Sequence, residues 1–150
     1  MGAWGIRALD SDEGLDVLDF LKGYCTPGRT ALRLEDIFAA MKGDGFFGDT
    51  FEEIDFYYDS SALALAELYL GWLDTGTFLP QDGGYITEIT ASGESIGFLL
   101  RYLRDIRNEV PDEDGERELT ALWRDSPDWE AWSSHLDALI RRLESEISNC

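Results

Sequence analysis

Apolar residues recur every three or four positions along most of this chain, and glycines separate the runs, a spacing that predicts helices. The first helix begins at Asp10 or Ser11, either of which is suited to cap it, and ends at Gly23. The second opens at Thr30 and stops at Gly43. The inward faces of these two helices are predicted to hold Leu15, Val17, Leu18, Leu21, Leu34, Ile37, Phe38 and Met41.

A third run is apolar on nearly every side. It starts at Ser60 or Ser61 and ends before Gly76, and such a helix is expected to be central and buried. A fourth helix starts near Ser92 or Ser95. Its inward face is predicted to hold Ile96, Leu99, Leu100, Leu103 and Ile106.

Two further helices are predicted near the C-terminus. A short one holds Leu119, Leu122 and Trp123. Ser126 followed by Pro127 is typical of a helix start, because a serine caps well and proline suits the first helical position. The last helix then carries an apolar stripe of Trp129, Trp132, Leu136, Leu139, Ile140 and Leu143.

The stretch before the fourth helix is ambiguous. Tyr85, Thr87 and Ile89 alternate with other residues as in a short strand. One strand without a partner does not make a sheet. We therefore expect an all-α fold, a single compact domain over residues 1–150 with five to six helices and one short β segment near 85–90 at most.

The net charge of the chain restricts the classes of function that are plausible. The chain carries 31 acidic and 12 basic residues, a net charge of −19, which repels phosphate backbones and so disfavours nucleic-acid binding. The same field attracts a basic protein partner, although solubility is the simpler interpretation and the one we favour. No apolar run is long enough to span a membrane. We expect a cytoplasmic protein, because no secretory signal is visible and Cys25 and Cys150 suit free thiols.

Motifs for catalysis are weak. The stretch from Gly43 to Gly48 matches G-x-G-x-x-G, but a helical pattern precedes it and acids follow it, so we interpret it as a turn. The acids around Asp112 and Asp114 do not have calcium-loop spacing. His135 is the only histidine and lies beside the apolar stripe, so a structural role is favoured over a metal ligand. We expect no cofactor and no metal.

Two clusters of side chains are more informative than these weak motifs. Arg101, Arg104 and Arg107 lie at helical spacing and are expected to pair with neighbouring acids, including Asp105. The other cluster mixes aromatic rings and acids between Gly43 and Asp59, and its rings are favoured to enter the core while the acids face water. The alternative is a partner surface made by Phe46, Phe47, Asp49, Glu52, Glu53, Asp55, Tyr57 and Tyr58.

These observations favour a non-enzymatic binding protein of the inhibitor or immunity type over a carboxylate-rich, metal-dependent hydrolase. The first accounts for the charge, the small size and the lack of a catalytic pattern. The second rests only on the density of acids.

The opening adds a further clue. Gly2 and Gly5 flank Trp4, and we expect the glycines to turn the backbone tightly while the buried indole anchors the terminus. Met1-Gly2-Ala3-Trp4-Gly5, followed by Leu9-Asp10-Ser11-Asp12 and a helix, resembles a bacterial group, domain-of-unknown-function family 4259. The small-residue helix from Ser60 to Leu70 and the ending that combines Trp123, Trp132 and Leu136 to Leu143 are similar to it as well. The resemblance implies a small helical bacterial protein and no particular activity.

Overall fold

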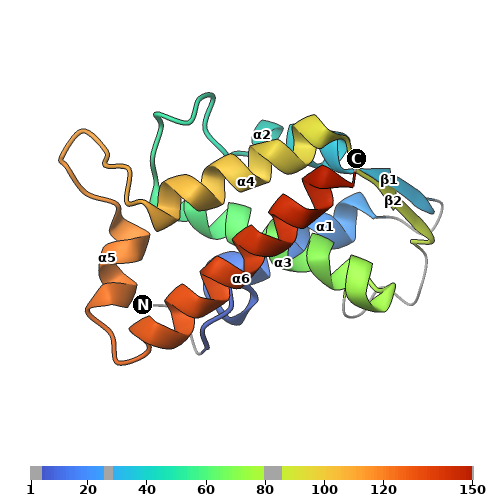
Figure 1. The fold of residues 1–150 in the computed structure, drawn as a ribbon. Helices are drawn as coiled ribbons and strands as arrows, with labels where there is room; N and C mark the ends of the chain where they lie inside the picture. The colour runs from blue at the N-terminus through green and yellow to red at the C-terminus, as the bar shows by residue number, and fades with distance from the viewer. Residues whose placement is uncertain (1–4, 26–28, 80–85, 150) are drawn as a thin grey trace.

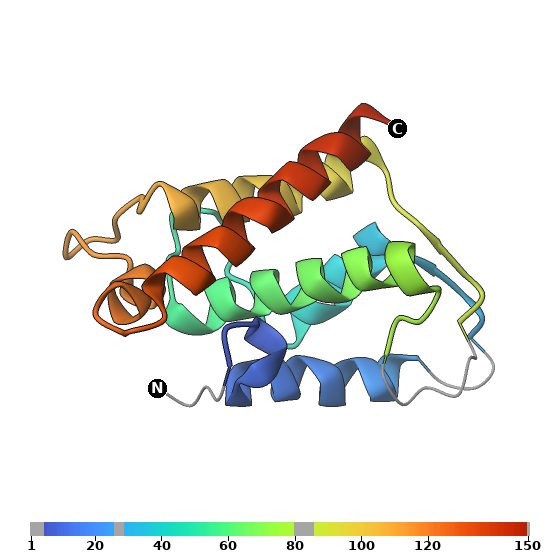
Figure 2. The same ribbon diagram turned by 60° about the horizontal axis from the view of Figure 1, so that its bottom comes forward.

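The computed structural model describes residues 5–25, 29–79 and 86–149, and its six α-helices include a central one that four others contact (Figure 1). The central helix α3 (Phe56–Thr75) contacts α1 (Asp12–Tyr24), α4 (Gly93–Arg107), α5 (Glu118–Arg124) and α6 (Trp129–Ser148). The remaining helix α2 (Leu34–Gly43) packs against α4. In Figure 2, α1 lies on one side of α3 and the α4–α6 pair lies on the other. The predicted all-α fold of five to six helices is confirmed.

The central helix is buried on every side over two turns, as its composition predicted, because all side chains from Asp59 to Ala66 lie in the interior. Its start, however, lies one turn before the predicted one. Asp55 caps the helix by accepting a hydrogen bond from the backbone N–H of Tyr57 at 2.8 Å. Gly76 ends it in a left-handed conformation, with φ of 77°.

A small parallel sheet replaces the predicted start of the second helix. β1 (Ala31–Arg33) pairs with β2 (Glu88–Thr90), and Leu32 lies opposite Ile89. The backbone carbonyl of Thr30 accepts a hydrogen bond from the N–H of Thr87 at 2.8 Å, so Thr30 belongs to the ladder and does not open a helix. The expectation of a strand without a partner was therefore wrong, because its partner lay among residues assigned to a helix. Tyr85 lies outside the described residues.

The first helix buries a narrower stripe than predicted. Its cap is Ser11, whose hydroxyl oxygen accepts a hydrogen bond from the N–H of Gly14 at 3.1 Å. Gly14, Val17 and Leu21 are buried at helical spacing, whereas Leu15 is 42% exposed because it lies one residue away from this stripe. A short 3-10 turn, η1 (Ala8–Asp10), precedes the helix and packs on it.

The C-terminal stripe is confirmed along α6. Trp132 is 2% exposed, and Leu136, Leu139 and Leu143 are buried behind it. The helix begins at Trp129 and not at the predicted Ser126–Pro127 pair, because the Ser126 hydroxyl instead accepts a hydrogen bond from the N–H of Asp128 within a turn. In α5, Leu119 and Trp123 are buried as predicted, but Leu122 faces outward.

Glu67 of α3 ties the start of the described chain to the core. Its carboxylate accepts hydrogen bonds from the backbone N–H groups of Ala8, at 2.8 Å, and Leu9, at 3.0 Å. The predicted anchoring by Trp4 and the geometry of Gly2 lie outside the described residues. Within the three described ranges, no helix combines the length and the apolar character that crossing a membrane requires.

Candidate functional site

The loop between α2 and α3, residues 44–55, turns its rings inward and its acids outward. Phe46 and Phe47 are buried, and Phe51 is half-buried. Within the predicted partner surface, Tyr57 and Tyr58 are also half-buried. The exposed members of that surface are Asp49, Glu52, Glu53 and Asp55. What the loop offers to a partner is therefore mainly carboxylate.

Aromatic packing holds this loop against α4. The Phe47 ring centroid lies 5.5 Å from that of Tyr102. The Phe51 centroid lies 5.1 Å from that of Phe98 and 5.2 Å from that of Tyr102. Ring pairs at these separations add to the stability that burial alone provides. The loop is thus a packed part of the molecule, and its carboxylates have a fixed support.

The glycine pattern from Gly43 to Gly48 forms a turn, as predicted. Helix α2 precedes it, where a dinucleotide site would need a strand. Gly45 has φ of 88°, a conformation that favours glycine. The carboxylate of Glu53 accepts a hydrogen bond from the N–H of Asp49 at 2.6 Å, so an acid occupies the position where a phosphate would need donors.

A second acidic segment lies beside the loop. We call residues 108–117, between α4 and α5, the acidic connector. The Asp112 carboxylate organises it by accepting hydrogen bonds from the N–H groups of Asp114, at 2.9 Å, and Glu116, at 3.0 Å. Gly115, with φ of 80°, closes the turn. The Asp112 side chain is thus engaged with the connector's own backbone.

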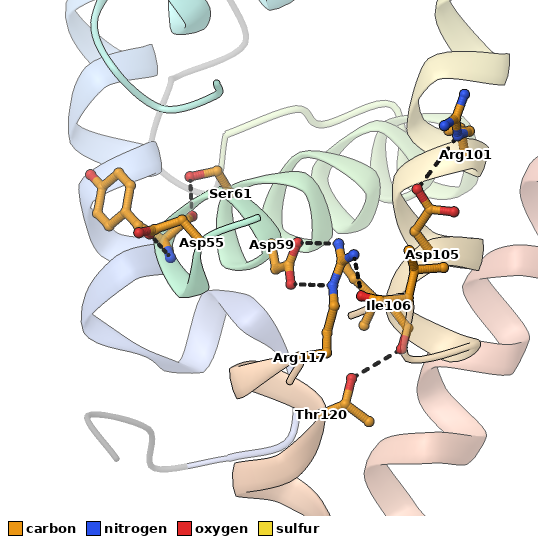
Figure 3. Close-up of polar contacts among 10 residues, drawn as sticks. Asp55, Asp59, Ser61, Arg101, Asp105, Ile106, Arg117 and Thr120 are labelled. Atoms are coloured by element: carbon orange, nitrogen blue, oxygen red, sulfur yellow. Dashed lines mark hydrogen bonds and ion pairs between the residues drawn. The ribbon is translucent and has the colours of Figure 1, made fainter. Parts of the chain in front are cut away.

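A buried ion pair fastens the end of the connector to the core (Figure 3). Arg117 donates two parallel hydrogen bonds to the Asp59 carboxylate, from Nη2 at 2.6 Å and from Nε at 2.8 Å. Its Nη1 donates to the backbone carbonyl of Val110 at 3.2 Å, which ties both ends of the connector together. The side chains are 2% and 1% exposed, so neither charge is hydrated. The Thr120 hydroxyl also donates to the carbonyl of Ile106, at 3.0 Å.

Burial raises the pKa of Asp59 to about 6, although the hydrogen bonds and charge of Arg117 act in the lowering direction. The neighbouring charges of Asp55 and Asp105 add to the rise. Burial also raises the pKa of Tyr102, beside this pair. Desolvation of the two charges offsets much of their attraction, so we interpret the pair mainly as a contact that positions the connector.

The loop and the connector enclose an open hollow of about 520 Å³ on the surface of α4. Its lining combines apolar side chains with charged ones. The apolar part consists of Phe51, Ile54, Val110 and Pro111. The charged part consists of four carboxylates and one guanidinium, from Glu52, Asp105, Asp112, Glu113 and Arg101. We call this feature the acidic hollow.

The three arginines of α4 pair with acids, as predicted. The guanidinium of Arg104 lies 2.7 Å from the Glu144 carboxylate, and that of Arg107 lies 2.6 Å from Asp137, both on α6. Arg101 differs because it pairs within its own helix, with Asp105 at 3.4 Å. Two of the arginines therefore join helices, and the third lines the acidic hollow.

His135 has a structural partner. Its Nε2 lies 2.8 Å from the Glu67 carboxylate, the same group that accepts from the N-terminal backbone. This contact supports the interpretation of His135 as a structural residue of α6. Over the ranges that the structure describes, no three His, Cys, Asp or Glu side chains converge in a way that would hold a metal ion.

Sequence reasoning missed the Asp59–Arg117 pair and the hollow above it. Asp59 is one of many acids in its stretch, and Arg117 is 58 positions away, so no spacing rule connects them. One local signal exists, because Arg117 is the only basic residue in an acidic run, residues 109–118, and lies just before the residues of α5. That the loop and the connector line one hollow depends on how the helices pack, which periodicity does not specify.

Three comparisons with known proteins bear on the family of this chain. A comparison with curated proteins gave no match, and neither did a comparison with solved structures. A family model described as a domain of unknown function, DUF4259, matches residues 2–135, which span most of the chain. The chain therefore belongs to the DUF4259 family.

Proposed function

We propose that this protein is a non-enzymatic binding protein whose acidic hollow docks a basic segment of another protein. Inhibitor and immunity proteins act in this way, by occupying the surface of a partner. The observation that carries the proposal is the composition of the hollow, whose lining combines four apolar side chains with four carboxylates, which we call the rim. Protein interfaces commonly surround an apolar centre with a polar border.

The electrostatics favour a cationic partner. Four carboxylates and one guanidinium line the hollow, and the whole chain carries a net charge of −19. Charge complementarity of this kind speeds encounter and selects among partners. The apolar side chains, among them Val110 at 39% exposure, supply surface for contact after encounter.

The support of the hollow fits the same role. Ring packing on α4 holds the loop side of the hollow, and the buried Arg117–Asp59 pair holds the connector side. A surface that is ordered before binding loses less conformational entropy on association. Among the described residues, no group of three or more His, Cys, Asp or Glu side chains is placed to hold a metal ion and so favour the hydrolase alternative.

Binding of a fluorescein-labelled hexa-arginine peptide, followed by fluorescence anisotropy at low salt, tests the proposal. Saturable binding is expected, and the variant with both Glu52→Gln and Glu113→Gln should bind about tenfold more weakly. The reason is that two charges are lost, one on the loop side and one on the connector side of the hollow, each worth about 0.7 kcal/mol near a ligand cation.

The matched control carries Asp12→Asn and Asp19→Asn, which remove two exposed charges from α1, on the far side of α3 from the hollow. Its affinity should stay within about twofold of the unmodified protein, because solvent and salt screen distant charges. Equal losses in the two double variants would show a general charge effect and contradict docking in the hollow. A lack of saturable binding would also refute the proposal.

A further inference from the structure

Arg101 occupies the acidic hollow in an arrangement unlike that of the other two arginines of α4. The carbon at the centre of its guanidinium lies 4.3 Å from the centre of the Phe51 ring. Its Nε donates to the Asp105 carboxylate at 3.4 Å, a long hydrogen bond. The hollow therefore already holds one guanidinium between an aromatic face and a carboxylate.

This arrangement is held weakly. The Arg101 side chain is 55% exposed, and its hydrogen bond to Asp105 is longer than the 2.7 Å and 2.6 Å contacts of Arg104 and Arg107. A guanidinium has five N–H donors, and the Nε–H of Arg101 is the one that donates to Asp105. An exposed pair of this kind contributes little to stability. Displacement of Arg101 by another cation therefore requires little free energy.

The rim has acceptors beyond those that Arg101 uses. Glu52 on the loop and Glu113 on the connector are exposed, and the hydrogen bond that the Asp105 carboxylate accepts from Arg101 is a long one. A guanidinium suits this set better than an ammonium group. It is planar, stacks on an aromatic face, and binds carboxylates through two parallel hydrogen bonds.

We infer that the acidic hollow is a guanidinium site that selects an arginine of the partner, and that Arg101 occupies it in the unbound protein as an internal competitor. The inference rests on the proposed function. In the bound state the partner's arginine stacks on Phe51 and pairs with the rim carboxylates, while Arg101 swings out toward solvent. Removal of Arg101 then strengthens binding by emptying the site.

The test compares Arg101→Gln with Arg104→Gln, using hexa-arginine and hexa-lysine peptides in the anisotropy assay at low salt. Both variants change the net charge equally and stand on the same helix, but the Arg104 guanidinium pairs with Glu144 away from the hollow. Thermal unfolding of both variants confirms that each is folded. We expect Arg101→Gln to bind hexa-arginine about fivefold more tightly than the unmodified protein, and Arg104→Gln to stay within about twofold.

The outcomes separate this inference from the proposed function. Binding of hexa-arginine by the unmodified protein, with no gain in Arg101→Gln over Arg104→Gln, would overturn the competitor role and leave the docking proposal standing. Equal affinity for hexa-arginine and hexa-lysine would overturn the selection of arginine. If neither peptide binds in a saturable manner, the proposed function fails, and the inference fails with it.

Discussion

At the scale of single residues, the most consequential contact is the one between Asp59 and Arg117. It joins the start of α3 to the end of the acidic connector through two hydrogen bonds, and both side chains are almost completely buried. The free energy lost when two charges are removed from water often exceeds the free energy gained from their attraction. A buried ion pair is therefore weak evidence for stability by itself. Its clearest consequence is position, because the Arg117 side chain also holds the carbonyl of Val110 at the edge of the hollow.

Arg117→Met should destabilise the protein by about 3–5 kcal/mol at neutral pH, because it leaves the Asp59 carboxylate buried without a counter-charge. Urea unfolding followed by circular dichroism measures this loss. The double variant with Asp59→Asn as well removes the orphaned charge and should recover a large part of it. A loss below about 1 kcal/mol in the single variant would contradict the buried pair.

Asp59 also predicts the pH dependence of stability. Its folded-state pKa of about 6 lies above its ordinary value of 3.8, so folding favours the protonated form. The stability from this group is therefore fully present below about pH 4 and is lost as the pH rises through about 6. We expect the free energy of unfolding to be about 1 kcal/mol higher at pH 5 than at pH 7.

Asp59→Asn should remove this rise between pH 7 and pH 5, as measured by urea unfolding at several pH values. Asp74 changes stability with pH in the opposite direction, because its hydrogen bond with Arg142 lowers its pKa. The stability from Asp74 is lost only as the pH falls below the range from 7 to 5. A wild-type stability that declines steadily from pH 7 to pH 5 would mean that other ion pairs dominate.

At the scale of elements, hydrophobic spacing predicted helix type and core faces well and predicted helix starts poorly. The stripe of α6 and the all-round burial of α3 are the clearest successes, because a strong pattern leaves one packing solution. The start of α3 was misplaced because Asp55 was one acid among many, and only the structure shows which one caps. The β1 strand was missed because its pairing with β2 joins segments that are far apart in the sequence.

The packing of η1 on α1 gives a prediction at this scale. A Cβ on Gly14 would overlap the backbone carbonyl of Ala8, whereas one on Gly23 of the same helix would meet open space. Gly14→Ala should therefore destabilise the protein by about 2 kcal/mol or more, since backbone must shift. Gly23→Ala should stabilise it by about 0.5 kcal/mol, because alanine favours a helix. Thermal unfolding of the two variants checks both signs, and equal effects would contradict the close approach of η1 and α1.

At the scale of the whole molecule, charge and shape act together. A net charge of −19 is spread over the surface, and the acidic hollow is where carboxylates from the loop, α4 and the connector meet around apolar side chains. Composition predicted the attraction to a basic partner, and the candidate surface was placed on the loop and the first turn of α3, without the connector. The connector's share of the hollow depends on the Asp59–Arg117 contact, which the sequence pattern did not reveal.

The most direct measurement of the central claim is a titration of the isotopically labelled full-length chain with hexa-arginine peptide at low salt, followed by backbone amide chemical shifts. Docking in the acidic hollow predicts that the largest shifts fall at residues 51–54, 101–105 and 110–113, around the hollow on α4. The exposed acids of α1 serve as the internal reference and should move little. Shifts of equal size over α1 and the hollow would instead reveal attraction to the overall charge and would contradict a dedicated docking site.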